Sequence, residues 1–222
     1  MQGKRSADRQ KRPDVCAATP TVFVVDDDEF VREALETLIQ VAGWHPLTFA
    51  SADLFLACPA AHGPNCLVLD VNLPGLNGLE LQSRIGRERG DMPIIFITGH
   101  GDVPTSVKAM KAGAVEFLTK PFGEDVLREA IAAALERSRA AIGGQAELRS
   151  LRERYASLTP REREVMAGVV SGLLNKQVGG ELGISEITVK KHRGRMMEKM
   201  RASSLPELVT MDVKLNASAT AR

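Results

Sequence analysis

Carboxylates, a hydroxyl and an ammonium group stand at the ends of short apolar runs in the first half of the chain. Asp26 and Asp27 follow the run TVFVV, and Asp70 follows the run CLVL. Thr98 ends a later apolar run, and Lys120 comes directly after the last one. If these runs are parallel strands of one sheet, their carboxyl ends share an edge and the five side chains converge there.

Side chains of these types suit a metal-dependent phosphoryl site. Three carboxylates at close range repel one another unless a divalent cation shares them, and oxygen ligands favour Mg²⁺. The Lys120 ammonium could neutralise a phosphoryl group, while the Thr98 hydroxyl binds one of its oxygens. Strand-end acids can also be merely solvated, and for Asp28 and Glu29 we favour that simpler interpretation.

A second candidate site is basic. Residues 185–201 contain six Lys and Arg residues against two acidic ones. Ser185, after the turn residue Gly183, is suited to cap a helix that runs to about Met200, and a short helix over 175–182 precedes it. A capped helix with basic first turns can enter the major groove of DNA with its N-terminus leading. A solvated face or a kinase-docking surface is the alternative for such a helix.

Five apolar runs alternate with helical patterns between residues 20 and 138. They cover 21–25, 46–50, 66–69, 93–98 and 116–119. Unbroken apolar runs of this length suit strands that are buried on both faces of a parallel sheet. The sequence therefore predicts an α/β domain, a doubly wound (βα)5 sheet of the flavodoxin-like kind. From residue 158 onward the patterns are helical, and Thr159-Pro160 marks a helix start in an all-α, four-helix domain with a helix-turn-helix.

Charge divides the chain in the same way. Residues 21–135 carry sixteen acidic and eight basic side chains, whereas residues 157–222 carry seven acidic and eleven basic ones. The acidic part suits a cation and the basic part suits phosphates.

Other features of the composition indicate a cytoplasmic protein. The sequence contains no run of eighteen apolar residues, and its first residues lack the apolar core of a secretion signal. Cys16, Cys58 and Cys66 show neither metal-ligand nor disulfide spacing, so we expect reduced thiols. We expect no contact with membranes.

The first domain resembles the receiver domain of two-component response regulators, most closely their FixJ branch. The resemblance is carried by VVDDDEFVREAL, LVLDVNLPGLNGLEL and FITGHGDVPTSVKAMKAGAVEFLTKPF, and by spacings of 43, 28 and 22 residues from Asp27 to Asp70, Thr98 and Lys120 in turn. It implies that Asp70 accepts a phosphoryl group from a phosphohistidine on a sensor histidine kinase.

The same resemblance implies the roles of the surrounding residues. Mg²⁺ would be held by the carboxylates of Asp26, Asp27 and Asp70 and by the backbone carbonyl of Asn72. Lys120 would pair with the phosphoryl group and precede a cis peptide bond to Pro121. Thr98 and Phe117 would form the pair of side chains that switches when Asp70 is phosphorylated.

The segment LTPREREVMAGVVSGLLNKQVGGELGISEITVKKHRGRMMEKMRASSLPELV resembles the LuxR/FixJ-type helix-turn-helix domain of the FixJ/NarL family. The positions matched to DNA contacts are Lys176, Thr188, Lys190, Lys191, Arg193, Gly194 and Arg195. Among them, Lys190, Lys191 and Gly194 would lie near bases, and Lys176 and Arg193 would contact phosphates. Gly179 and Gly180 depart from the family, which has Ala or larger residues there, and we expect each to soften the short helix.

Together the two resemblances imply a transcriptional regulator and not an enzyme. Phosphorylation would produce a homodimer through Val107 and Lys111 of a helix over 105–112, and the dimer would bind two half-sites of double-stranded DNA. Activation of transcription, with RNA polymerase as a further partner, is the expected output. One alternative is a transcription factor that binds DNA regardless of phosphate. Another is a haloacid-dehalogenase-type phosphatase, which is disfavoured because Asn72 stands where its second Asp would be needed.

The expected domain boundaries follow from these segments. They are a disordered basic tail at 1–19, the receiver domain at 20–138, a helical linker at 139–156 with a break at Gly143-Gly144, the helix-turn-helix domain at 157–214 and a flexible tail at 215–222.

Overall fold

The computed structural model describes residues 19–220, apart from 62, 90–91 and 100–102. The expected basic tail therefore lies almost entirely outside the described residues. The chain divides into two compact units, Met1–Ile142 and Gly143–Arg222.

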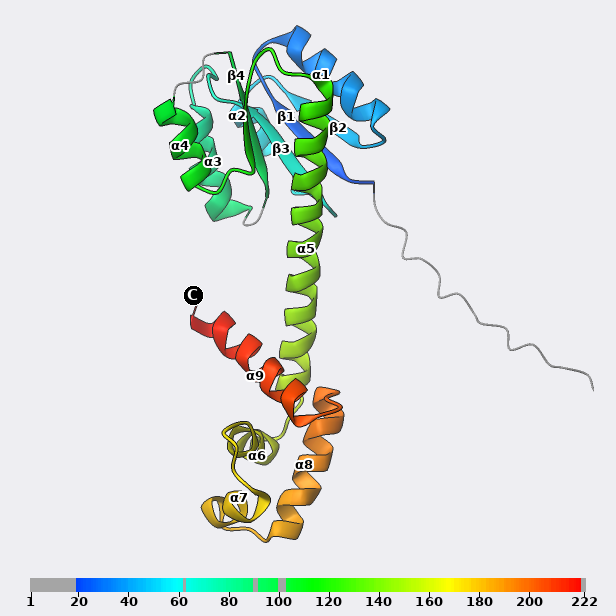
Figure 1. The fold of residues 1–222 in the computed structure, drawn as a ribbon, viewed down its shortest axis with the longest axis vertical. Helices are drawn as coiled ribbons and strands as arrows, with labels where there is room; N and C mark the ends of the chain where they lie inside the picture. Colours follow the sequence, from blue (N-terminus) through cyan, green and yellow to red (C-terminus); the bar gives the residue numbers. More distant parts are fainter. Residues whose placement is uncertain (1–18, 62, 90–91, 100–102, 221–222) are drawn as a thin grey trace, which may run out of the picture. The chain divides into compact units, whose positions relative to one another are not determined.

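A five-stranded parallel sheet forms the centre of the first unit (Figure 1). Its strands are β1 (Thr21–Val25), β2 (His45–Phe49), β3 (Asn65–Asp70), β4 (Ile94–Thr98) and β5 (Glu116–Thr119), and their spatial order is β2-β1-β3-β4-β5. The helices between them are α1 (Glu29–Val41), α2 (Ala52–Ala57), α3 (Gly78–Glu88) and α4 (Val103–Lys111), with α5 (Glu124–Ala156) after β5. The predicted (βα)5 fold is confirmed.

Side chains of alternating strand positions supply two separate core layers. On β1, Val22 and Val24 pack with residues of α1 and α5, whereas Phe23 and Val25 pack with residues of α2, α3 and α4. All four side chains are fully buried. Burial on both faces, which β3 and β4 share with β1, explains why these three strands appear in the sequence as unbroken apolar runs.

Four helices make up most of the second unit. They are α6 (Pro160–Val170), α7 (Asn175–Leu182), α8 (Glu186–Met200) and α9 (Leu205–Thr220), and they share a core that includes Val165, Val178, Val189, Met196 and Leu208. Thr159 caps α6 in a reciprocal capping box with Glu162, and Ser185 caps α8 by accepting a hydrogen bond from the backbone N–H of Thr188. Gly183 ends α7 with φ 65°, a left-handed conformation that glycine adopts without strain.

Two expectations about the ends of elements were wrong. The predicted break at Gly143-Gly144 is absent, because α5 continues through both glycines to Ala156. Its flanking Ala, Glu, Leu and Arg residues favour the helix enough to offset about 1 kcal/mol per glycine. The tail expected from residue 215 is instead helical as far as Thr220, since α9 extends to that residue.

Gly179 and Gly180 also behave differently from what the sequence suggested. A Cβ on Gly179 would lie 2.7 Å from the backbone oxygen of Ile184, whereas a Cβ on Gly180 would meet nothing within 4 Å. The hydrogen bond from Ile184 N to Gly179 O, 3.0 Å long, brings this turn close to α7. Gly179 is therefore required by the packing of the α7–α8 turn, and Gly180 alone softens the helix.

We expect opposite effects when the two glycines are replaced by alanine. Gly180→Ala should stabilise the second unit by about 0.5–1 kcal/mol through helix propensity. Gly179→Ala should destabilise it, because the new methyl group would displace backbone atoms of the turn. Urea unfolding monitored by circular dichroism would measure both changes, and equal effects of the two substitutions would contradict this account.

Candidate functional site

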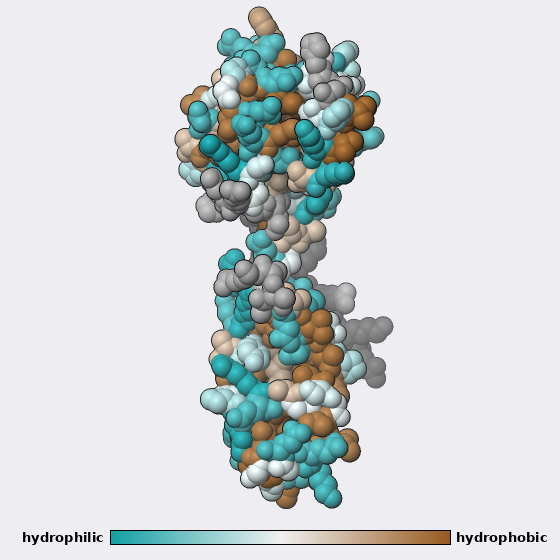
Figure 2. Space-filling view, turned by 90° about the vertical axis from the view of Figure 1, so that its left-hand side faces the viewer, coloured by the Kyte–Doolittle hydropathy of each residue, from teal (hydrophilic) through white to brown (hydrophobic). Residues whose placement is uncertain are grey.

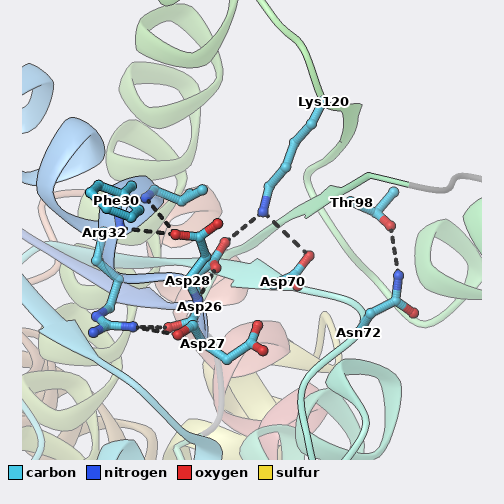
Figure 3. A network of polar contacts seen from close by, with 10 residues as sticks. Asp26, Asp27, Asp28, Phe30, Arg32, Asp70, Asn72, Thr98 and Lys120 are labelled. Carbon is cyan, nitrogen blue, oxygen red and sulfur yellow. Dashed lines mark hydrogen bonds and ion pairs between the residues drawn. The ribbon is translucent and has the colours of Figure 1, made fainter.

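The three predicted carboxylates converge at the carboxyl edge of the sheet (Figure 3). β1 and β3 are neighbours, so Asp26 and Asp27 after β1 come close to Asp70 at the end of β3. One carboxylate oxygen from each residue lies within 4.8 Å of the others. Asp26 and Asp70 are buried and Asp27 is exposed, so the cluster opens to solvent on one side.

Lys120 provides the positive charge of this site. Its Nζ lies 2.6 Å from Oδ2 of Asp26 and 3.7 Å from Oδ1 of Asp70. β5 and the turn that follows it deliver this side chain to the edge, and the peptide bond between Lys120 and Pro121 is cis, as the resemblance implied. The ammonium group therefore lies between two carboxylates and is close enough to stabilise negative charge that develops on either one.

The surroundings of the Asp70 carboxyl group shift its pKa upward. Burial raises the pKa of Asp70, the nearby Lys120 counteracts this rise, and the negative charges of Asp26 and Asp27 add to it. Oδ1 of Asp70 is buried and accepts no hydrogen bond from any described residue. An oxygen with an unused lone pair beside two further carboxylates fits a hard divalent cation such as Mg²⁺.

The predicted switch residues lie on the other side of Asp70. Nδ2 of Asn72 donates a hydrogen bond of 3.3 Å to Oγ1 of Thr98, which is fully buried at the end of β4. The half-buried ring of Phe117 packs against that of Phe96, with 6.2 Å between the ring centroids. Thr98 and Phe117 are thus on adjacent strands, as the sequence predicted.

Arg32 is a residue of this site that the sequence reasoning missed. From the first turns of α1, its Nη1 donates hydrogen bonds of 2.8 Å and 2.9 Å to the backbone oxygens of Asp26 and Asp27. Asp28, which we expected to be merely solvated, caps α1 by accepting from Phe30 N at 2.9 Å. These hydrogen bonds hold the acidic loop in place. The helix cap could have been recognised from the sequence, because Asp28 is of a residue type that favours the N-cap position and stands directly before a helical pattern.

Gly78 is a second residue that was missed. A Cβ at this position would lie 2.6 Å from the backbone oxygen of Asp70 and 3.2 Å from the ring of Phe96. The start of α3 can approach the end of β3 only because the side chain is absent. Asn77-Gly78 before a helical pattern was a signal for a helix start, since Asn77 caps α3, but it did not reveal this contact.

The candidate DNA-contacting residues fall into two groups. Lys176, Lys190, Lys191, Gly194 and Arg195 are exposed. Thr188 and Arg193 are half-buried and already engaged: Oγ1 of Thr188 lies 2.8 Å from Oγ of Ser185, and Nη1 of Arg193 donates to Oδ1 of Asn175 at 3.1 Å. Lys190 forms an exposed ion pair of 3.0 Å with Glu186. Thr188 and Arg193 therefore hold α8 in position. Thr188 contacts the cap residue Ser185, and Arg193 contacts Asn175 of α7.

The remaining candidate ligands form no further site in the part of the chain that is described. Among the described residues, Asp26, Asp27 and Asp70 are the group of His, Cys, Asp or Glu side chains that lie close enough together to hold a metal ion. Cys58 and Cys66 are free thiols, and burial raises the pKa of Cys66 far above its ordinary value. Cys16 lies outside the described residues.

Comparison with known proteins assigns both units. Residues 22–132 match the response regulator receiver domain, and residues 156–212 match the bacterial regulatory proteins of the luxR family. Nodulation protein W of Bradyrhizobium diazoefficiens is 48% identical over 89% of this chain and 87% of its own length. The chain belongs to the LuxR-type response regulators. The transcriptional regulatory protein FixJ of the same organism is 42% identical over 87% of this chain and 94% of its own length.

A low-resolution structure of the response regulator StyR matches most of this chain. It is 46% identical, with a TM-score of 0.79, and the match covers 89% of this chain and all of the StyR chain. This response regulator is therefore a DNA-binding transcriptional regulator of the two-component type, with a sensor kinase and DNA as its partners, and not an enzyme. Within the described residues, no helix is both long enough and apolar enough to cross a lipid bilayer.

Proposed function

We propose that this response regulator accepts a phosphoryl group on Asp70, dimerises and then controls transcription from paired DNA half-sites. The observation that carries the proposal is the buried Oδ1 of Asp70, which lacks a hydrogen bond from the described residues and lies 3.7 Å from Lys120. A carboxylate oxygen in this position is free to act as a nucleophile, and the nearby Lys120 ammonium can stabilise the charge of the incoming phosphoryl group.

In the proposed transfer, an oxygen of Asp70 forms a bond to phosphorus as the bond from phosphorus to the kinase histidine breaks. The imidazole leaves with the bonding electron pair. Lys120 pairs with the phosphoryl oxygens, and the Thr98 hydroxyl donates to one of them. Mg²⁺, held by the carboxylates of Asp26, Asp27 and Asp70 and the carbonyl of Asn72, would neutralise charge on those oxygens. Each protein molecule accepts one group, so no substrate is turned over.

Removal of the metal should slow phosphorylation at least about a hundredfold, because several kcal/mol of charge stabilisation would be lost. The measurement is the time course of intact mass with acetyl phosphate and Mg²⁺, with and without EDTA, and with Asp26→Asn. Asp28→Asn is the matched control, since this exposed carboxylate lies in the same loop and serves as a helix cap. Phosphorylation at an undiminished rate in EDTA would rule out the metal.

The proposed dimer surface lies on α4. Val103, Val107 and Met110 are exposed by 75%, 42% and 44% and follow one another at helical spacing, with Lys111 exposed beside them. α4 contributes a single fully buried side chain, Ala109, so it can shift at low cost. A phosphoryl group that attracts Thr98 would allow Phe117 to turn further inward, and this would bias the packing of α4 toward the dimer-forming arrangement.

We expect a monomer without phosphate and a dimer with it, and Val107→Asp should keep the phosphorylated protein monomeric. A carboxylate at this position would be desolvated next to its symmetry mate, at a cost of several kcal/mol. Light scattering with and without acetyl phosphate measures the change. Val41→Asp, at an 85% exposed position on α1, is the control and should dimerise normally. A wild type that is dimeric before phosphorylation would refute this route.

For DNA, we propose that α8 enters the major groove, with Lys190 and Lys191 near bases and Lys176 near a phosphate. Arg195 and Gly194 are the further exposed candidates, while Thr188 and Arg193 act mainly by orienting α8. A dimer would place two such helices on two half-sites.

We further propose a cytoplasmic activator that contacts RNA polymerase, with a receiver domain over 20–138 and a DNA-binding domain over 157–214. The intact Asp70, Thr98 and Lys120 argue against a regulator that ignores phosphate.

A further inference from the structure

One apolar side chain is exposed at the N-terminal end of the basic face of α8. Ile187 is 80% exposed, and Lys190, Lys191 and Gly194 follow it at intervals of three, four and seven residues, which places them on the same side of the helix. The core residues Val189, Met196 and Met200 lie on the opposite side. Ile187 therefore lies at the N-terminal end of the exposed face, three and four residues before Lys190 and Lys191.

Stability does not explain this isoleucine. With 80% of its surface exposed, the side chain gains little from burial, and β-branching lowers its helix propensity. Val213 on α9 offers a comparison: it is exposed by 61%, and no Lys or Arg stands three or four residues away from it on either side, whereas Lys190 and Lys191 stand three and four residues after Ile187. Lys214 directly follows Val213 and therefore projects from a different side of the helix. A ligand is the remaining source of a favourable contact for Ile187.

The neighbours of Ile187 indicate the chemistry of that ligand. Interfaces between proteins are depleted in lysine, whereas surfaces that bind nucleic acid are rich in it. Figure 2 shows apolar residues at the surface of this unit among hydrophilic ones. In Figure 1, the N-terminal end of α8 comes directly after the turn that connects it to α7. In the major groove, the C5 methyl group of thymine is the apolar group that a base edge presents.

Gly194 makes such an approach possible. A Cβ at this position would meet nothing within 4 Å, so the packing of the unit does not require glycine there. Glycine inside a helix weakens it, but it also leaves room for another molecule to come close to the helix backbone. The open space at Gly194 lies two turns after Ile187 on the same face of α8. If α8 enters the major groove, the wall of the groove would pass close to this position.

We propose that Ile187 contacts a thymine methyl group and so selects thymine at one position of each operator half-site. This inference rests on the proposal that α8 enters the major groove. Burying one methyl group against Ile187 should change affinity about threefold to fivefold per half-site. The lysines beside it would supply most of the affinity, and Ile187 would supply discrimination at that position.

The test begins with selection of duplexes from a random library by the full-length protein treated with acetyl phosphate and Mg²⁺. Each thymine of the selected half-site is then replaced by uracil, which lacks the methyl group, and binding is measured for wild type, Ile187→Ala and Val213→Ala. We expect uracil at one position to weaken binding by wild type and by Val213→Ala. Ile187→Ala should bind thymine and uracil at that position equally, and circular dichroism should show that it is folded.

Two results would overturn the inference. If Ile187→Ala still prefers thymine over uracil at every position at which wild type does, the side chain does not read the methyl group. If Lys190→Ala, Lys191→Ala together leave operator binding unchanged, α8 is not in the groove, and the proposed placement fails along with the inference. Gly194→Ala should weaken operator binding while strengthening the helix, and equal or tighter binding would contradict the proposed close approach.

Discussion

Asp70→Asn is expected to abolish phosphorylation by acetyl phosphate completely. The amide that replaces the carboxylate is a poor nucleophile and carries no charge for a dication or for Lys120 to share. Asp26 and Asp27 lie nearby, but Nζ of Lys120 is already paired with Asp26 at 2.6 Å, and Asp27 is exposed. Asp70 alone combines burial, a position at the end of a central strand and an oxygen without a hydrogen bond from the described residues.

Intact mass spectrometry should show one added phosphate on the wild type and none on Asp70→Asn. Asp53→Asn is a suitable control, because Asp53 lies in the first turn of α2 and is exposed. Labelling of Asp70→Asn to the wild-type extent at a neighbouring carboxylate would show that the acceptor was wrongly assigned. If Asp70→Asn is unlabelled but still becomes dimeric with acetyl phosphate, dimerisation does not depend on this site.

The second large effect is expected at a buried ion pair in the DNA-binding unit. Nζ of Lys199 on α8 lies 2.6 Å from Oε2 of Glu162 on α6, and Glu162 is 2% exposed. The same Oε2 accepts from Thr159 N at 2.9 Å, and Nζ of Lys199 also donates to Ser157 O at 3.2 Å. One carboxylate thus joins the end of α8 to the start of α6, and this holds α8 in position.

Lys199→Met should destabilise the second unit by about 2–3 kcal/mol near pH 7, because a buried carboxylate would lose its cation. We expect less than the loss from a fully buried pair, since the Lys199 side chain is 35% exposed. Lys214→Met is the control: the ion pair between Lys214 and Glu147 is exposed on both sides, and its loss should have little effect.

The destabilisation should depend on pH in a defined direction. The hydrogen bond from Lys199 is the main cause that lowers the pKa of Glu162 below its ordinary value of 4.5, and the bond from Thr159 N adds to it. A lowered pKa in the folded state contributes stability that is complete above 4.5 and is lost as the pH falls through the folded value. The stability difference between wild type and Lys199→Met should therefore shrink below pH 4.5.

Urea unfolding can resolve the two units of the intact protein. Trp44, the single tryptophan, lies in the first unit, so its fluorescence reports that unit alone, whereas circular dichroism reports both. The transition that circular dichroism detects without a change in Trp44 fluorescence belongs to the second unit. A difference between wild type and Lys199→Met that stays constant from pH 7 to pH 3 would contradict a role for the Glu162 charge.

The sequence by itself determined the architecture of both units and most of the acidic site. Strands β1, β3 and β4 are buried on both faces of the parallel sheet, which requires continuous apolar runs, so local composition was enough to recognise them. The edge strands β2 and β5 are only partly buried, and they were recognised from the alternation of short apolar runs with helical patterns. Parallel strands end at one edge, and this rule was enough to bring Asp26, Asp70 and Lys120 together. The helix caps Thr159 and Ser185 could also be recognised from the sequence, because a capping side chain forms a hydrogen bond with a backbone N–H only a few residues away.

Contacts between distant segments were decided by the tertiary structure. Gly179 and Gly180 are adjacent and identical in the sequence, yet only Gly179 lies against the backbone of Ile184. Lys199 and Glu162 are 37 residues apart, and nothing in the local pattern of either distinguishes them from solvated charges. Burial and hydrogen bonding across elements depend on where the whole chain places each atom, and periodicity along one element carries no information about that placement.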